Sequence, residues 1–184
     1  MATKRLSENA TYVERGYGQV EPNHLSAQRT GQIYAQLPAA DTIEVLENGQ
    51  FVKYNYAAGV VDYVGEGEWM LVFNEVKIYD DKEVENDFAM KEGNYVAKVY
   101  SAYPENMPEG TQMVPRVFKT NVGDIFTTNT IAETELKVTD VLVVGDNGYL
   151  TKTAGTNAGD MKWQVVKVYT MPDMQKGVKI MRIA

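Results

Sequence analysis

Few residues in this sequence could carry out chemistry. The chain of 184 residues has one histidine, His24, three serines and no cysteine. The lack of cysteine excludes a thiolate nucleophile, an iron–sulfur cluster, a disulfide framework and a cysteine zinc site. Catalysis by a serine triad would need His24 and one of Ser7, Ser26 and Ser101. Because His24 lies in a polar segment with no sign of a rigid scaffold, we interpret it as a surface residue.

The densest charged feature is an acidic run between residues 80 and 92. An EF-hand calcium loop beginning at Asp81 would need glycine at its sixth position and glutamate at its twelfth. The sequence has Asn86 at the sixth position and Glu92 at the twelfth. The pattern favours a solvent-exposed acidic face, with a weak cation site as the alternative. The carboxylates of the run belong to Asp80, Asp81, Glu83, Glu85, Asp87 and Glu92.

The sequence contains no motif for a bound cofactor. Gly65-Glu66-Gly67 begins like a dinucleotide-binding loop, but Met70 stands where the third glycine should be. No Gly-Lys-Ser or Gly-Lys-Thr triplet of a phosphate-binding loop occurs. The paired carboxylates of a glycosidase have no spacing that a sequence would reveal. We therefore expect no cofactor, no metal and no enzymatic activity.

Composition narrows the class of protein further. The net charge is −7, from 18 Lys and Arg against 25 Asp and Glu, and an acidic surface repels nucleic acid. No apolar stretch approaches the roughly 20 residues that span a bilayer, and the basic start of the chain has no apolar stretch behind it, so we expect no signal peptide. A hydrophobic content of 44% suffices for a core. These features predict a globular protein that binds neither nucleic acid nor membrane.

The charge changes sign near residue 40. Residues 1–40 carry a net charge of +1, whereas residues 41–184 hold fourteen basic and twenty-two acidic residues, a net charge of −8. The apolar positions of residues 1–40 follow neither helical nor strand periodicity, and glycines and prolines interrupt them. We predict an extended N-terminal arm over residues 1–40, which lies across its own body or a neighbouring subunit; the alternative is a structured leader packed on its own domain. Since Tyr and Arg are enriched at interface hot spots, the arm is predicted to bind protein. Its candidate contact residues are Lys4, Arg5, Tyr12, Arg15, Tyr17, Arg29 and Tyr34.

Residues 41–184 show the pattern of an all-β protein. Many short apolar runs at intervals of 8–12 residues predict a sandwich or barrel-like body of short antiparallel strands. Two Asn-Gly pairs, at 48–49 and 147–148, each predict a hairpin between the flanking strands. A Pro-Asp turn predicts a third hairpin at the C-terminus. The expected strands are 42–46, 50–54, 68–73, 76–79, 95–100, 114–118, 124–128, 141–144, 149–152, 163–170 and 178–183; one short helix is expected within 81–91.

Residues 104–110 form the best internal boundary, because two prolines and a glycine discourage regular structure there. The β body is expected to be either one compact unit or two lobes, 41–103 and 111–184, joined by this segment.

Four stretches resemble small structural proteins of tailed bacteriophages. They are Leu46–Lys53, Val122–Asn129, Val141–Lys152 with its Gly-Asp-Asn-Gly turn, and Val165–Asp173. The first is similar to the opening hairpin of head-decoration proteins. The resemblance implies an auxiliary protein, made in the host cytoplasm, that binds the outside of an assembled head and cements it. The implied partners are the major capsid protein and further copies of the chain, for which a trimer would suit the local three-fold sites of a capsid.

The residues also leave a second function open. Exposed aromatic side chains could stack on sugars, which would make the chain a carbohydrate- or receptor-binding β module of a head fibre or tail. The candidate aromatic residues are Tyr54, Tyr56, Tyr63 and Trp69. For the decoration protein, deletion of residues 1–40 is expected to leave a folded β body that no longer binds its assembly.

Overall fold

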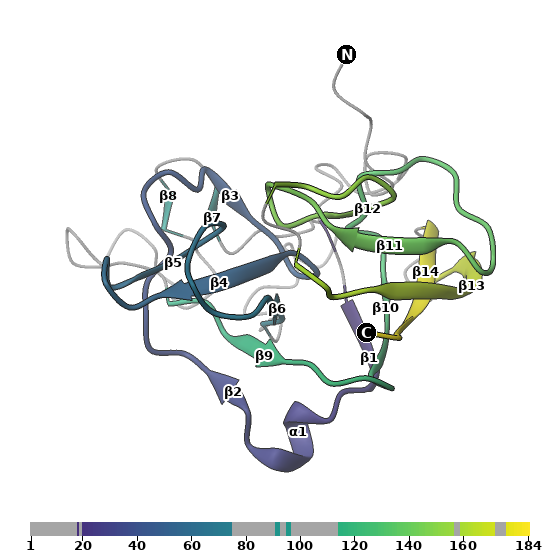
Figure 1. Cartoon of the computed structure of the whole chain (residues 1–184), viewed down its shortest axis with the longest axis horizontal. Helices are drawn as coiled ribbons and strands as arrows, with labels where there is room; N and C mark the ends of the chain where they lie inside the picture. The colour runs from purple at the N-terminus through teal and green to yellow at the C-terminus, as the bar shows by residue number, and fades with distance from the viewer. Residues whose placement is uncertain are drawn as a thin grey trace, which may run out of the picture.

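The chain is built almost entirely from antiparallel strands (Figure 1). The computed structural model describes residues 18, 20–74, 91–92, 95–96, 114–156, 159–171 and 176–184. The predicted all-β body of short antiparallel strands is confirmed, and the two larger sheets form a sandwich or half-barrel. The described chain contains one helical turn, α1 (Ala27–Thr30), which the sequence pattern did not predict.

The two larger sheets contain six and five strands. The order in the six-stranded sheet is β1 (Val20–His24), β10 (Ile125–Thr128), β14 (Lys176–Arg182), β13 (Trp163–Thr170), β11 (Val141–Val144) and β12 (Leu150–Thr151). The order in the five-stranded sheet is β2 (Ile33–Tyr34), β9 (Val117–Lys119), β6 (Met70–Val72), β4 (Phe51–Asn55) and β5 (Val60–Asp62). A small third sheet contains β3 (Val45–Leu46), β7 (Lys91–Glu92) and β8 (Tyr95–Val96).

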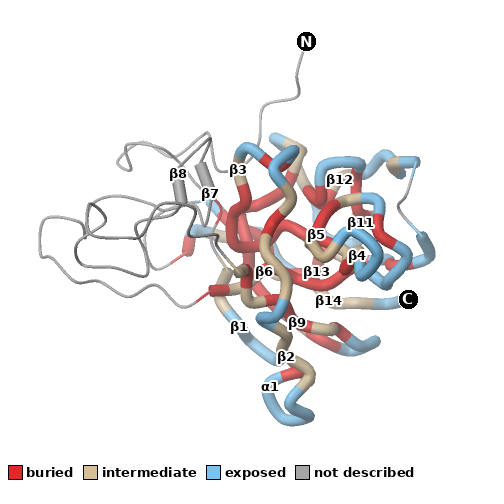
Figure 2. The backbone as a smooth tube through the Cα atoms, turned by 90° about the vertical axis from the view of Figure 1, so that its left-hand side faces the viewer, coloured by how far each residue is buried: buried red, intermediate tan, exposed pale blue. Residues whose placement is uncertain are grey.

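The main core lies between the two larger sheets. Three fully buried aromatic side chains meet there: the ring centroid of Trp163 lies 5.7 Å from that of Phe51 and 5.0 Å from that of Phe126. Aromatic pairs at such separations stabilise a fold beyond their burial alone. In Figure 2 the buried residues gather at the centre of the molecule, while the exposed ones lie on α1 and the outer loops. The two sheets therefore share one hydrophobic core.

The five-stranded sheet is buried on both of its faces. Side chains alternate between the faces of a strand, so Phe51 and Leu71 contact the main core while Val52, Met70 and Val72 contact a second one. The segment 39–46 covers that second face with buried apolar side chains. This arrangement explains why the strands at 51–52 and 70–72 are continuous apolar runs. The residues of that segment in the second core are Ala39, Ile43 and Leu46.

Two of the three predicted hairpins are confirmed. Strands β11 and β12 pair across the Asp146–Gly148 turn, and β13 pairs with β14 at the C-terminus. The hairpin predicted across Glu47–Gly49 is wrong, because β3 pairs with β7 whereas β4 pairs with β5 and β6. The physical reason is that this turn is buried: the amide N–H of Gly49 donates to Val72 O at 2.9 Å, so the turn bonds to β6.

The predicted arm is wrong for residues 20–40. Strand β1 pairs with β10, and β2 pairs with β9, so this segment supplies an outer strand to each of the two larger sheets. The side chains of Leu25 and Ala27 are buried in the main core. Short strands that lack a periodic pattern of their own can gain stability by pairing with an existing sheet. The remaining residues of the predicted arm, apart from Gly18, lie outside the described residues.

The two predicted lobes share a sheet. Strand β9 follows the expected boundary, yet it pairs with β6, which precedes it, and with β2. The boundary segment 104–110, the strand predicted at 76–79, most of that predicted at 95–100 and the short helix predicted within 81–91 lie outside the described residues. Among the residues that the structure describes, no helix is long and apolar enough to cross a membrane.

Candidate functional site

A buried polar cluster holds the first described residue, Gly18, against the junction of the two larger sheets. The amide N–H of Gly18 donates to Glu47 Oε2 at 2.8 Å, and Tyr149 Oη donates to Glu47 Oε1 at 3.4 Å. Thr130 Oγ1 donates to the carbonyl oxygen of Asn48 at 2.5 Å. We call this cluster of Gly18, Glu47, Asn48, Thr130 and Tyr149 the N-terminal seat. It fixes the position of Gly18 on the body.

The polar side chains of the seat are shielded from solvent. Glu47 has 0% of its surface exposed, Asn48 3% and Thr130 0%. A carboxylate is stable in such a place only when hydrogen bonds replace its water, and both oxygens of Glu47 have such bonds. Removing these donors would leave a buried carboxyl group with fewer hydrogen bonds, so Glu47 and Gly18 stabilise each other.

Sterics make glycine necessary at Gly18 of the seat and at Gly49, which follows Asn48 of the seat. A Cβ atom on Gly18 would overlap Thr130 Oγ1 and lie 2.7 Å from the carbonyl oxygen of Asn48. Gly49 has a φ of +93°, and a Cβ atom there would lie 2.6 Å from Thr128 Oγ1. Real Cβ atoms do not approach other atoms so closely. The chain backbone can therefore enter the seat only because these two residues lack a side chain.

The turn at Glu47–Gln50 connects the seat to both sheets. Gln50 Oε1 accepts from the backbone N–H of Glu47 at 2.6 Å, while Gln50 Nε2 donates to Asn147 O at 3.0 Å and to Tyr63 Oη at 3.1 Å. Asn48 and Asn74 exchange two further bonds, of 3.2 and 2.8 Å. These bonds run from β4 and β6 to the tip of the β11–β12 hairpin, so the seat is a rigid joint between the sheets.

Titration of Tyr63 reports on the integrity of this joint. Burial raises the pKa of Tyr63 from about 10 to about 12, with a further rise from the charge of Glu47, while the hydrogen bond from Gln50 opposes the rise. Because the folded-state pKa exceeds the unfolded value, the associated stability is complete below pH 10 and is lost as the pH rises towards 12. Tyr63→Phe should therefore flatten the fall of the unfolding free energy in this range, as measured by urea unfolding.

The matched control is Tyr56→Phe, which removes a phenol that is 72% exposed, and it should keep the wild-type curve. Burial also raises the pKa of Tyr54 and of Tyr169, so some alkaline loss of stability will persist in Tyr63→Phe. Equal slopes for the wild type and Tyr63→Phe would show that Tyr63 does not titrate with folding.

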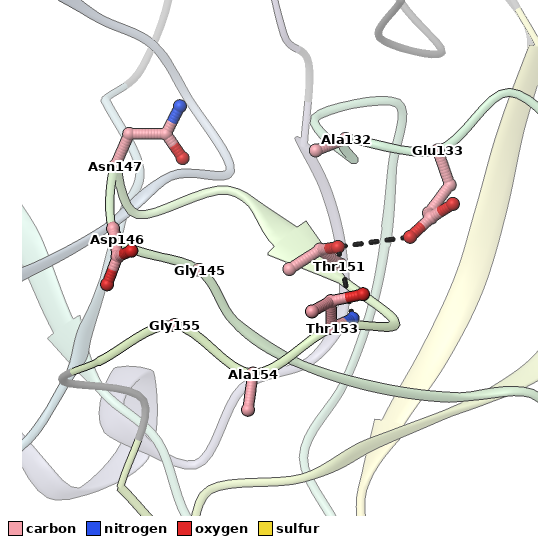
Figure 3. Close-up of a pocket in the computed structure, with 9 residues that line it drawn as sticks. All are labelled: Ala132, Glu133, Gly145, Asp146, Asn147, Thr151, Thr153, Ala154 and Gly155. Atoms are coloured by element: carbon pink, nitrogen blue, oxygen red, sulfur yellow. Dashed lines mark hydrogen bonds between the residues drawn. The ribbon is translucent and has the colours of Figure 1, made fainter. Parts of the chain in front are cut away.

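A hollow of about 630 Å³ lies beside the β11–β12 hairpin (Figure 3). Glu133 Oε1 accepts from Thr151 Oγ1 at 3.0 Å and from the amide of Lys152 at 2.8 Å, and Asp146 Oδ1 accepts from the amide of Thr156 at 2.6 Å. Figure 3 shows Glu133 and Asp146 on opposite sides of the hollow. Both carboxylates hold loops in place through these hydrogen bonds.

His24 and Ser26 lie close together in sequence but do not form a catalytic pair. His24 is exposed at the end of β1. Ser26 Oγ donates to Asp124 Oδ2 at 2.9 Å and accepts from Asn121 Nδ2 at 2.7 Å. The serine hydroxyl thus fastens the start of α1 to the loop before β10. No group of three or more metal-ligating side chains occurs among the described residues.

The structure places two of the predicted arm residues on the body. Arg29 is exposed in the last turn of α1, and Tyr34 is half-buried in β2, where its ring lies 5.9 Å from that of Tyr54. Neither residue lies on an extended arm, which corrects the prediction for this pair. The other five lie outside the described residues: Lys4, Arg5, Tyr12, Arg15 and Tyr17.

The four candidate aromatics for sugar stacking do not form one exposed surface. Tyr54 and Trp69 are each 3% exposed, and Tyr63 is half-buried in the joint between the sheets. The ammonium of Lys53 lies 4.8 Å from the centre of the Trp69 ring and covers it. Only Tyr56 presents its ring to solvent.

Sequence reasoning missed the N-terminal seat. Glu47-Asn48-Gly49 has the composition of a solvent-exposed turn, and nothing local distinguishes its buried form. One signal was present, namely the four polar residues 127–130 between Phe126 and Ile131, all of which are buried. Comparison with protein-family models, with curated proteins and with solved structures found no match to this chain.

Proposed function

We propose that this chain decorates and cements the outside of a bacteriophage capsid. In this proposal it is made in the host cytoplasm and acts on the virion exterior, where it binds the major capsid protein and further copies of itself. The observation that carries the proposal is the N-terminal seat, which anchors the residues before Gly18 to a rigid joint. A binding segment that starts from a fixed point loses less entropy when it docks on a neighbour.

The residue types before the seat support this function. Residues 1–17 contain Lys4, Arg5, Tyr12, Arg15 and Tyr17, and Tyr and Arg are the residues that contribute most to protein interfaces. A short segment of this kind forms a modest interface. On a capsid, a body contact and a segment contact act together, so that the combined affinity exceeds either by a factor of about 10²–10⁴. Many such copies would oppose the internal pressure on the shell.

Capsids that lack this protein provide the test. The full-length protein and a variant without residues 1–17 are each mixed with such capsids and sedimented, and the bound fraction is measured against concentration. We expect deletion of residues 1–17 to weaken binding by about 100-fold, since one of two linked contacts is lost. The melting temperature should be unchanged, because Gly18 and all residues of the described strands remain.

Arg29→Ala is the matched control, because Arg29 is an exposed cation on the body, and it should bind as the wild type does. Unchanged binding by the deletion variant would overturn the proposed role of residues 1–17. Failure of the full-length protein to bind capsids would overturn the proposed function itself.

A further inference from the structure

The C-terminal hairpin is basic, whereas the rest of the chain is acidic. Residues 161–184 carry five cationic residues and one acidic residue, a net charge of +4, whereas residues 1–160 carry thirteen against twenty-four, a net charge of −11. The cations are Lys162, Lys167, Lys176, Lys179 and Arg182. A basic hairpin on an acidic protein attracts carboxylates to one place on its surface.

Two of these cations are held side by side on neighbouring strands. Lys167 stands directly opposite Lys179 in the β13–β14 register, an arrangement that is destabilising between like charges. Their ammonium groups lie 5.0 and 6.0 Å from the centre of the Tyr169 ring. Tyr169 Oη is in turn fixed by Thr127 Oγ1 at 2.9 Å and Glu21 Oε2 at 3.1 Å. Among the described residues, neither lysine forms a salt bridge.

The same part of the hairpin has an open strand edge. Strand β11 pairs only with Trp163 and Gln164 of β13, and the backbone of Val165 bonds to Thr139 and Asp140. Beyond that point, the described part of the chain contains no strand that pairs with this edge of β13. The side chain of Val168 is 46% exposed there. An open edge with exposed apolar and cationic side chains suits an added strand that carries carboxylates.

The chain itself contains a segment of that chemistry. Residues 80–92 have six carboxylates and two lysines, a net charge of −4 that matches the +4 of residues 161–184. The run ends in β7, which pairs with β3 in the three-stranded sheet. In Figure 1 that sheet and the β13–β14 hairpin lie on opposite sides of the molecule. The end of the run at β7 therefore lies away from the hairpin of its own copy.

We propose that the outer half of the hairpin, residues 166–170 and 176–179, docks residues 80–87 of the acidic run of a second copy of this chain by strand addition. Such a contact joins two different surfaces, so each copy can both give and receive a strand. Contacts of this type build rings when the rotation between copies closes. The inference rests on the self-association in the proposed function and names the segments that make that contact. Its test uses the isolated protein, so a negative result would leave the proposed capsid binding untouched.

Charge reversal on each surface tests the inference. Association of the purified protein is measured by sedimentation velocity at about 0.1 M and about 1 M salt, where screening lengths are about 10 Å and about 3 Å. The wild type should associate at low salt and dissociate at high salt. We expect the double variant Lys167→Glu/Lys179→Glu to weaken association at least about tenfold. Glu83→Lys/Glu85→Lys should do the same.

A mixture of the two double variants is the decisive sample. Each variant alone places like charges at the substituted positions, whereas in the mixture the introduced glutamates of one variant face the introduced lysines of the other, so association should return. The control Arg29→Glu/Lys137→Glu makes the same change in net charge at exposed cations outside residues 161–184 and should associate as the wild type does. Thermal melting confirms that all variants fold.

Three results would overturn the inference. They are a wild type that stays monomeric at low salt, a hairpin variant that associates normally, and a mixture of folded variants that fails to regain association. If the hairpin variant loses association while Glu83→Lys/Glu85→Lys associates normally, the hairpin binds another segment. That result would likewise reject the acidic run as the strand that docks there.

Discussion

Deletion of residues 1–40 is expected to unfold the β body, whereas deletion of residues 1–17 should leave the fold intact. The longer deletion removes β1 and β2, one outer strand from each of the two larger sheets. It also removes the buried side chains of Leu25 and Ala27 from the main core. Loss of one buried leucine side chain costs about 2–5 kcal/mol, whereas a whole domain is stable by only about 5–15 kcal/mol.

The same deletion leaves a buried carboxylate short of donors. Asp124 is 1% exposed and accepts from the amide and the hydroxyl of Ser26, each at 2.9 Å, and from the amide of Asn121 at 2.9 Å. Loss of the two bonds from Ser26 costs a further ~1–3 kcal/mol. The sum is comparable with the whole stability of the protein.

Circular dichroism and thermal melting of the two deletion proteins provide the measurement. The protein without residues 1–17 should melt cooperatively, near the temperature of the full-length chain. The protein without residues 1–40 should show no cooperative transition. A cooperative transition within a few degrees of the full-length value would contradict the assignment of residues 20–40 to the body.

Gly148→Ala is expected to be the most damaging single substitution at the junction of the sheets. Gly148 has a φ of +77°, and its carbonyl accepts the amide of Phe51 at 2.8 Å. A Cβ atom would overlap the carbonyl oxygen of Phe51 and lie 2.9 Å from Tyr63 Cε1. Strain and overpacking together should cost about 2–4 kcal/mol, which lowers the melting temperature of a chain of this size by about 5–15 °C.

Gly123→Ala is the matched control for backbone strain. Gly123 also has a positive φ, of +95°, but nothing lies within 4 Å of a Cβ atom there. Its substitution should cost only about 1 kcal/mol, from backbone strain alone. If the two substitutions lower the melting temperature equally, the close contact between the β11–β12 turn and the start of β4 does not exist in solution.

Local sequence chemistry was sufficient to predict most strands of the β body, though not β5 and β7, and two of its hairpins. At Asp146–Gly148 a glycine takes up the positive φ that the turn needs, and the flanking runs pair in register. The strands of the C-terminal hairpin likewise have partners adjacent in sequence. The pairing of such strands depends on residues that are close in the sequence. A short stretch of sequence therefore contains what is needed to predict it.

The candidate site could not be predicted in the same way. Gly18 and Glu47 are 29 residues apart in the sequence, and Glu47 and Tyr149 are 102 apart. The sequence likewise suggested Tyr54 and Trp69 as exposed aromatic residues. In the structure, Tyr54 lies in the second core and Lys53 covers the ring of Trp69. Burial of such residues depends on which distant strands pack together.

The sequence by itself determined an acidic, cysteine-free, all-β protein whose strands meet in local hairpins. Only the tertiary structure decided that the Glu47–Gln50 turn is buried, that residues 20–40 belong to the sheets, and that Lys167 and Lys179 stand opposite each other. The physical reason is common to all three. Turn and strand propensities act over a few residues, whereas pairing and burial depend on contacts between segments far apart in the chain.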